Sequence, residues 1–212
     1  MKGHRLLYAN LLLLLVLAGS AVLGGCTQPA KTPEPARPPA ARPTPVQKAQ
    51  PAQPAQTFGD ELLKNASFEQ GTPEKIEAWT VLPATVGTLE QTGAADGAAC
   101  LRLAANPKKG YGTLQQPIDL PPGSQGKTIK AQVLIKGAKA KQAGLALLVK
   151  SGDKETRLAQ ADTSGAADWE TLSATAEAPQ LAVGETLLFR VMVRPGVKAP
   201  ILVDNASARL SK

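Results

Sequence analysis

The sequence has almost no histidine: of 212 residues, His4 is the only one. His4 lies in an N-terminal segment that we expect to be removed during export, so the mature chain is expected to contain none. Ser-His-Asp triads, Cys-His nucleophile pairs, His-ligated zinc or haem and imidazole pH switches each need an imidazole as base, ligand or titrating group. These kinds of site are therefore excluded from the mature chain.

Cysteine and aromatic residues are also scarce. Only Cys26 and Cys100 are present, so neither a disulfide framework nor a CxxC metal site can form. Cys100 lies among apolar residues in an expected strand, and we predict a free, buried thiol that packs as a small hydrophobic group. Aromatic residues make up 3% of the chain, which limits how many rings a binding surface can offer to a sugar.

Residues 1–25 have the pattern of a secretory signal peptide. Lys2 and Arg5 precede an apolar run at 11–18, which is well short of the roughly 20 residues that span a bilayer. The segment ends in LGGC at Cys26, which resembles the bacterial lipobox. The resemblance implies cleavage before Cys26 and anchoring of the chain in a membrane by acyl chains on that residue. We expect a lipid-anchored protein of the cell envelope, with Thr27 favouring the outer membrane.

Residues 26–57 are interpreted as the lipidated cysteine and a linker. Of the 31 residues at 27–57, nine are proline, seven are alanine and none is aromatic. Proline fixes φ and lacks an amide donor, so this composition predicts a disordered, extended, hydrated linker without a core of its own. The remaining residues, 58–212, are enough for one folded domain.

The net charge of +7 comes mainly from the N-terminal segments. Six of the 24 Lys and Arg residues and one of the 17 Asp and Glu residues precede residue 58, which leaves 18 basic and 16 acidic residues in the domain, a net charge of +2. With export, no basic stripe and no nucleic-acid-binding motif, we exclude nucleic acid as a partner. Catalysis is not expected, because no pair of carboxylates can be placed across a cleft of about 5–9 Å, as glycoside hydrolysis requires.

Period-two alternation of apolar and polar residues dominates the sequence after residue 57, which is typical of β-strands. The segment 127–136 places Ile129, Ala131, Val133 and Ile135 on one face, and 187–193 alternates in the same way. No helical periodicity of useful length occurs. We therefore predict an all-β domain, an antiparallel β-sandwich. Further strands are expected at 79–82, 98–104, 111–118, 143–150, 155–161, 169–177 and 201–210, with turns at 121–123, 151–153, 164–165 and 194–196.

Four motifs in this domain resemble a known family. The run 61–71 (ELLKNASFEQG) followed by Trp79 is similar to the first strand of the jelly-roll carbohydrate-binding modules of families four, nine and twenty-two. The runs 110–118 (GYGTLQQPI), 169–173 (WETLS) and 201–210 (ILVDNASARL) resemble later strands of these modules, in the same order. The resemblance implies a jelly-roll β-sandwich of the galactose-binding-domain-like type. It implies sugar binding less directly, because this fold carries many functions.

Asp204 in the closing strand is a candidate metal ligand. Alternation puts it on the more apolar face with Leu202 and Ala206, so its carboxylate is expected to point inward and to need a partner. The resemblance implies that Asp204 and Glu69 share a structural calcium ion, with Gly71 as a nearby backbone donor. The alternative is that Asp204 accepts hydrogen bonds from backbone amides near the first strand.

Tyr111 is the ring that we expect to be exposed and available for stacking on a sugar. Its strand places Tyr111 and Gln115 on the face opposite the apolar side chains, and Gln132 and Arg190 also face away from the aliphatic residues of their strands. Together they predict a polar, cationic surface suited to an anionic or highly hydroxylated glycan. The alternative is a solvated sheet face without a ligand. The other rings are expected in the core or at its rim: Phe68, Trp79, Trp169 and Phe189.

The sequence thus favours a non-catalytic, lipid-anchored module that binds an envelope or extracellular polysaccharide. The alternative is a structural or assembly lipoprotein that uses the same β-sandwich to contact another protein.

Overall fold

The computed structural model describes residues 58–108 and 110–212. The signal peptide at 1–25, the lipidation of Cys26 and the linker at 26–57 lie outside these residues and stay predictions. Within the described ranges, no helix is long and apolar enough to cross a membrane.

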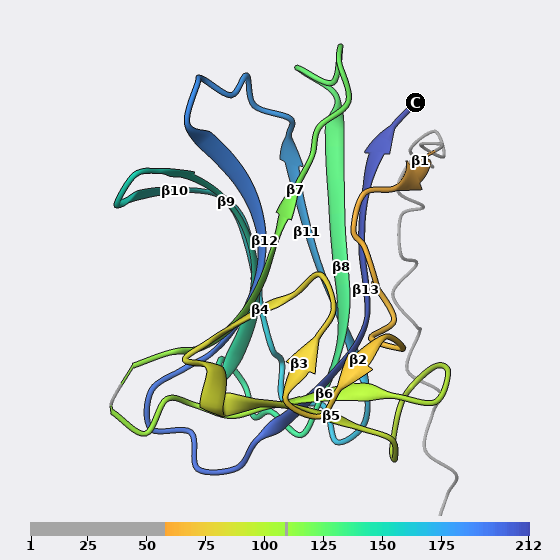
Figure 1. Cartoon of the computed structure of the whole chain (residues 1–212), viewed down its shortest axis with the longest axis vertical. Helices are drawn as coiled ribbons and strands as arrows, with labels where there is room; N and C mark the ends of the chain where they lie inside the picture. The colour runs from red at the N-terminus through yellow and green to blue at the C-terminus, as the bar shows by residue number, and fades with distance from the viewer. Residues whose placement is uncertain (1–57, 109) are drawn as a thin grey trace, which may run out of the picture. The chain divides into compact units, whose positions relative to one another are not determined.

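The regular secondary structure in the described part of the chain consists of strands and a single turn of 3-10 helix (Figure 1). The elements are β1 (Phe58–Glu61), β2 (Gly71–Thr72), β3 (Lys75–Ile76), β4 (Thr80–Leu82), η1 (Ala84–Val86), β5 (Gly87–Glu90), β6 (Cys100–Leu103), β7 (Gly112–Ile118), β8 (Thr128–Lys136), β9 (Ala143–Ser151), β10 (Lys154–Asp162), β11 (Glu170–Glu177), β12 (Glu185–Val193) and β13 (Ile201–Ser211).

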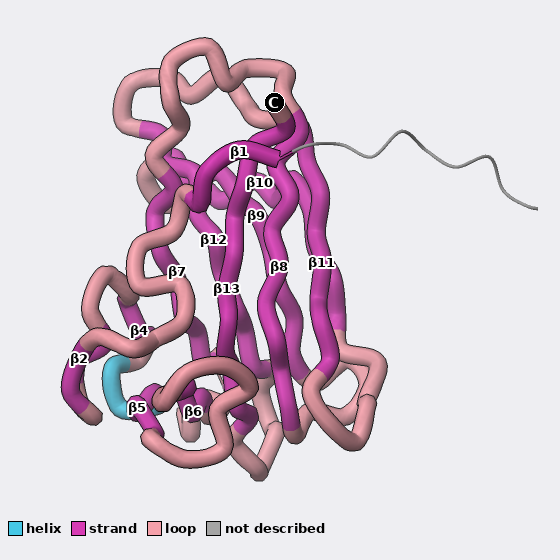
Figure 2. The backbone as a smooth tube through the Cα atoms, turned by 90° about the vertical axis from the view of Figure 1, so that its right-hand side faces the viewer, coloured by secondary structure: helices cyan, strands magenta, loops and turns pink. Residues whose placement is uncertain are grey.

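The strands form two antiparallel sheets that face each other. One sheet has the order β11-β8-β13-β6-β5, with β1 added beside β13, and the other has the order β10-β9-β12-β7-β4. Figure 2 shows β11, β8 and β13 side by side in the sheet nearer the viewer, with the second sheet behind it. A hairpin of β2 and β3 belongs to neither sheet. The predicted antiparallel β-sandwich is confirmed.

The core lies between the two sheets. The inward side chains of β8 are fully buried, and so are Leu187, Phe189, Val191 and Val193 of β12. The Trp79 ring packs against Phe68 and Phe189, with centroid distances of 5.1 and 5.7 Å. Burying each of these large side chains stabilises the fold by roughly 1.5–3 kcal/mol. All buried apolar residues of the described chain fall between Leu63 and Leu210, so the segment 58–212 contains a complete core and is expected to fold on its own.

The nine predicted strands are all present, with ends that differ by at most two residues. The strands β1, β2, β3 and β5 were not predicted as such: the run 61–71, which is similar to a first strand of the family, contains only the end of β1 and the start of β2. Each of them has only two to four residues, which is too short to show a clear alternation. Each is defined by its pairing with another segment: β1 with β13, β2 with β3, and β5 with β6.

Candidate functional site

The face of the sheet β10-β9-β12-β7-β4 that points away from the core, here called the outer face, holds most of the predicted polar surface. In β12, Arg190 and Met192 alternate with the buried core residues and therefore lie on this face. Arg190 pairs in register with Gln115 of β7 on one side and with Ala146 of β9 on the other. The predicted common face of Arg190 and Gln115 is therefore confirmed.

Tyr111, immediately before β7, is exposed as predicted, with 47% of its surface accessible. It lines two neighbouring hollows of about 260 and 110 Å³. Both hollows are also lined by Met192 of β12 and Arg157 of β10. The ring thus has a polarizable thioether and a guanidinium group as neighbours in both hollows, which together are called the groove here.

Arg190 and Glu155 form a two-pronged ion pair across this groove. The Nη1 and Nη2 atoms of Arg190 each donate to a Glu155 carboxylate oxygen at 2.6 Å, and its Nε donates to Oε1 of Gln115 at 3.0 Å. These hydrogen bonds from Arg190 hold the pKa of Glu155 below its usual value. Paired hydrogen bonds of this kind fix a side chain in one orientation, so Gln115, Arg190 and Glu155 form a rigid polar row over the small residue Ala146.

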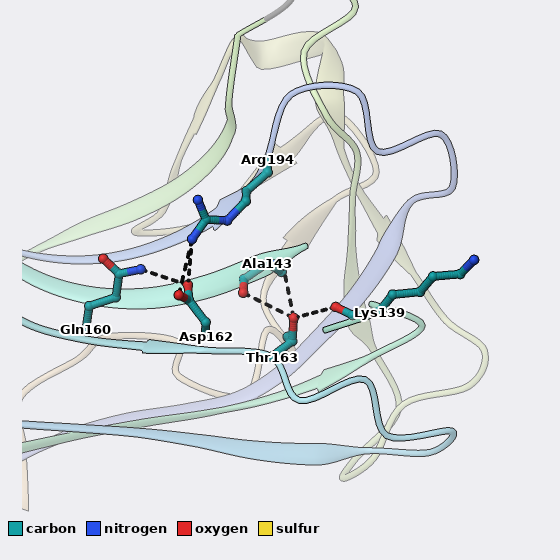
Figure 3. A network of polar contacts seen from close by, with 6 residues as sticks. All are labelled: Lys139, Ala143, Gln160, Asp162, Thr163 and Arg194. Atoms are coloured by element: carbon teal, nitrogen blue, oxygen red, sulfur yellow. Dashed lines mark hydrogen bonds and ion pairs between the residues drawn. The ribbon is translucent and has the colours of Figure 1, made fainter. Parts of the chain in front are cut away.

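A second polar network lies at the other end of the groove (Figure 3). Nη2 of Arg194 donates to both carboxylate oxygens of Asp162 at 3.2 Å, and the Gln160 amide donates to Oδ1 of Asp162 at 2.7 Å. Beside it, the Thr163 hydroxyl donates to the Lys139 carbonyl oxygen at 2.8 Å and accepts from the Ala143 amide at 3.2 Å. These contacts fix the end of β10 against the start of β9.

Gln132 does not belong to this groove, so its grouping with Tyr111 was wrong. It lies on β8, in the other sheet, and lines a separate hollow of about 370 Å³ with Phe58, Lys130 and Asn205 among others. Alternation shows which side of a strand a residue occupies, and Gln132 does point away from the core. It does not show which sheet the strand joins, and β8 pairs with β11 and β13 rather than with β12.

The predictions for the other rings and for Cys100 agree with the structure. Phe68, Trp79 and Phe189 are buried, whereas Trp169 is half-buried, with the Lys136 ammonium 6.0 Å from its ring centre. Cys100 is a free, buried cysteine. Burial, together with the nearby carboxylates led by Asp204, raises the pKa of its thiol to about 11. The thiol is therefore held in its unreactive protonated form.

Asp204 is fully buried, as predicted, but on the other side of its sheet. Val203 pairs with the core residue Ile135, and Asp204 pairs with Leu134, whose side chain points away from the core. A loop covers Asp204 there: the amides of Ala95 and Asp96 donate to its Oδ2 at 2.7 and 3.0 Å. A β-bulge between Asp204 and Ser207 shifts the alternation, which is why the simple pattern gave the wrong side.

Glu69 caps the same loop, because its Oε1 accepts hydrogen bonds from the amides of Ala98 and Ala99 at 3.0 and 3.1 Å. Gly71 instead pairs with Ile76 in the small hairpin. The amide N–H groups around both carboxylates carry partial positive charge, so this arrangement does not fit a calcium ion. In the described ranges no three acidic, His or Cys side chains come together as a metal cluster. The geometry favours the alternative, carboxylates that hold backbone amides, over the calcium site implied by the resemblance, and a calcium titration tests the choice.

Sequence reasoning missed the part that β10 plays in the groove. The turn expected at 151–153 joins two predicted strands into a hairpin, which is enough to place β10 beside β9. A bulge between Arg157 and Ala159 then changes the alternation within β10. As a result Arg157 and Asp162 lie on the same face although they are five residues apart, and a strict period of two does not predict this.

Comparison with known proteins identifies the fold. No family model and no curated protein sequence matches the chain. Among solved structures, a cyclase from Fischerella sp. TAU superposes with a TM-score of 0.55 at 19% identity, over 73% of this chain and 98% of the cyclase. The CBM22-1 xylan-binding domain from Paenibacillus barcinonensis Xyn10C gives a TM-score of 0.51 at 21% identity, over 74% of this chain and 99% of that domain.

The described domain therefore has the jelly-roll β-sandwich fold that carbohydrate-binding modules and cyclases of this kind share. At these identities the likeness concerns the fold alone, and a fold of this kind does not fix the function.

Proposed function

We propose that this protein is a non-catalytic, lipid-anchored lipoprotein of the cell envelope whose jelly-roll domain binds a glycan on the outer face. One observation carries the proposal: the half-exposed ring of Tyr111 lies between two hollows, with oriented guanidinium, amide and carboxylate groups at either end. Sugars are recognised by an aromatic ring against the pyranose face and by fixed polar groups that bond the hydroxyls. The groove offers both kinds of contact.

The state of the carboxylates supports binding rather than hydrolysis. A general acid that protonates a glycosidic oxygen near neutral pH needs a raised pKa. In the groove, the pKa of Glu155 is lowered by its hydrogen bonds from Arg190. Asp162 is likewise occupied by Arg194 and Gln160. Both carboxylates are therefore suited to orient neighbouring groups and to accept hydrogen bonds from hydroxyls.

The membrane anchor in this proposal is the lipobox cysteine, Cys26, followed by the proline-rich linker at 27–57. An anchor with two or more acyl chains holds a protein stably at a membrane, and the linker separates the domain from that surface. Replacing Cys26 by Ser is expected to move the protein from the membrane fraction to the soluble fraction. Retention of the C26S protein in the membrane would contradict the lipid anchor, and we favour the outer membrane because Thr27 follows the cysteine.

A glycan array probed with residues 58–212 tests the binding proposal. Loss of ring stacking costs roughly 0.5–1.5 kcal/mol beyond buried area, so Tyr111→Ala is expected to reduce retention on the bound glycan about tenfold or more. Tyr111→Phe keeps the ring and is expected to bind nearly as wild type. Gln132→Ala, on the opposite sheet, is the matched control and is expected to have no effect. Equal retention of wild type and Tyr111→Ala would contradict the proposal.

The rival function, contact with another protein, has its own expected result in the same series. A structural or assembly lipoprotein would show no glycan retention and would capture a protein partner in a pull-down. That capture would be unchanged by Tyr111→Ala if the partner binds elsewhere on the sandwich.

A further inference from the structure

We propose that the glycan bound in this groove carries an anionic group, a carboxylate or a sulfate, and that Arg157 selects it. The inference rests on the proposed function, because it names the chemical class of ligand for the same site. Two observations support it. The residues that line the groove have a net positive charge, and the guanidinium group of Arg157 is not part of either ion pair in the groove.

The groove contains three guanidinium groups and two carboxylates. The residues that line its two hollows include Arg157, Arg190, Arg194, Glu155 and Asp162. Each carboxylate is taken by one arginine: Glu155 by Arg190 at 2.6 Å, and Asp162 by Arg194 at 3.2 Å. The groove therefore has a net charge of +1, and that charge belongs to Arg157.

Arg157 is exposed, and its guanidinium group forms no ion pair or hydrogen bond with any residue of 58–108 or 110–212. It lines both hollows beside Tyr111 and Met192. A guanidinium group donates to carboxylate and sulfate oxygens with paired, charge-assisted hydrogen bonds. An anionic substituent on a sugar ring stacked on Tyr111 could thus accept hydrogen bonds from the Arg157 guanidinium group, which makes none to other side chains.

Gly144 lines the smaller hollow, and its lack of a side chain leaves room there for the Asp162 carboxylate. Gly144 and Ala146 of β9 lie between β12 and β10 on the outer face. A Cβ atom at Gly144 would lie 2.6 Å from Oδ1 of Asp162. A larger residue there would displace the Asp162 carboxylate from Arg194 and leave a second unpaired charge. Glycine at position 144 therefore preserves the pairing that makes Arg157 the only unmatched guanidinium group in the groove.

The test compares glycans that differ only in charge. Residues 58–212 are titrated with polygalacturonate, with the same polymer after its carboxyl groups have been reduced to alcohols, with dextran sulfate and with unmodified dextran. Anionic polymers are expected to bind at least tenfold more tightly than their neutral counterparts. Added salt is expected to weaken the binding of the anionic polymers only. Comparison of the polygalacturonate and dextran sulfate arms shows which anionic group the site takes.

Arg157→Gln is expected to remove this preference, while Arg157→Lys keeps the charge and is expected to retain part of it. Lys154→Gln removes the same charge from the same strand but outside the hollows, so it is the matched control and is expected to keep the preference. Thermal melting of each variant verifies folding.

Two results would overturn the inference while leaving the proposed function in place: equal binding of neutral and anionic polymers, or an unchanged preference in Arg157→Gln. In both cases Tyr111→Ala would still weaken binding. If no glycan of any charge is retained, the proposed function itself fails, and the inference fails with it.

Discussion

At the scale of single residues, Asp204 has the most unusual environment. Burial raises the pKa of its carboxyl group above the usual 3.8, although hydrogen bonds from Asp96, Ala95 and Asn205 oppose this. The folded chain therefore binds this proton more readily than the unfolded chain. Well below pH 3.8 the Asp204 carboxyl group is protonated in both the folded and the unfolded chain, so its ionisation does not change the free energy of unfolding. As the pH rises from 3.8 through the folded value, ionisation favours the unfolded state.

Asp204→Asn isolates this contribution, because asparagine does not titrate. We expect the free energy of unfolding of the wild type, measured relative to Asp204→Asn, to decrease as the pH rises from about 3.8 and then to level off. Urea unfolding of both proteins at a series of pH values measures the difference. A difference that stays flat, or that increases over this range, would contradict the raised pKa.

Calcium binding at Glu69 and Asp204 has an equally direct test. Both carboxylates already accept backbone N–H groups of the loop that covers them, so from this geometry we expect calcium in excess over chelator to leave the thermal midpoint unchanged. A rise of the midpoint would instead support the metal site implied by the resemblance, since a ligand that binds only the folded state stabilises it. Glu69→Gln would then abolish that rise.

At the scale of elements, Gln116 of β7 connects the chain before β2 to the second sheet. It is 3% exposed, and its side chain accepts from the Lys64 amide at 2.6 Å and donates to the Lys64 carbonyl oxygen at 2.9 Å. Gln116→Leu would leave both backbone groups without partners. We expect it to lower the free energy of unfolding by about 1–3 kcal/mol.

Gln115→Leu is the matched control for this measurement, because the neighbouring glutamine lies on the outer face of the same strand. Because its side chain accepts a single hydrogen bond, from Arg190, its effect on denaturant unfolding is expected to be smaller, about 1 kcal/mol or less. Equal losses in the two variants would show that Gln116 does not connect the segments as described.

The elements also show how far the sequence predicts this fold. Long strands such as β8 and β12 carry four apolar residues each at alternate positions, so their existence and buried face follow from the sequence. Two β-bulges interrupt the alternation on which this prediction depends. The bulge in β13 moved Asp204 to the opposite side, and the bulge in β10 brought Arg157 and Asp162 to one face. Bulges are not visible in a hydrophobic pattern.

At the scale of the whole molecule, the candidate site depends on which strands share a sheet. Tyr111, Gln115 and Arg190 meet because β7 and β12 are neighbours, although about 75 residues separate them. Gln132 has the same local pattern but lies in the opposite sheet. Long-range strand pairing of this kind is determined by the packing of the complete sandwich. A local sequence pattern therefore predicted which side chains point away from the core, but it did not predict which of them lie in the same sheet.

The central claim is that the outer face of the sheet β10-β9-β12-β7-β4 is the binding surface of the molecule. Amide chemical-shift mapping of residues 58–212, titrated with the glycan that is retained best on the array, tests this most directly. The account predicts shifts at Tyr111 and along β7, β12, β9 and β10, with little change around Gln132 and Lys130 of β8. Shifts confined to the β8 side, or none near Tyr111, would contradict it.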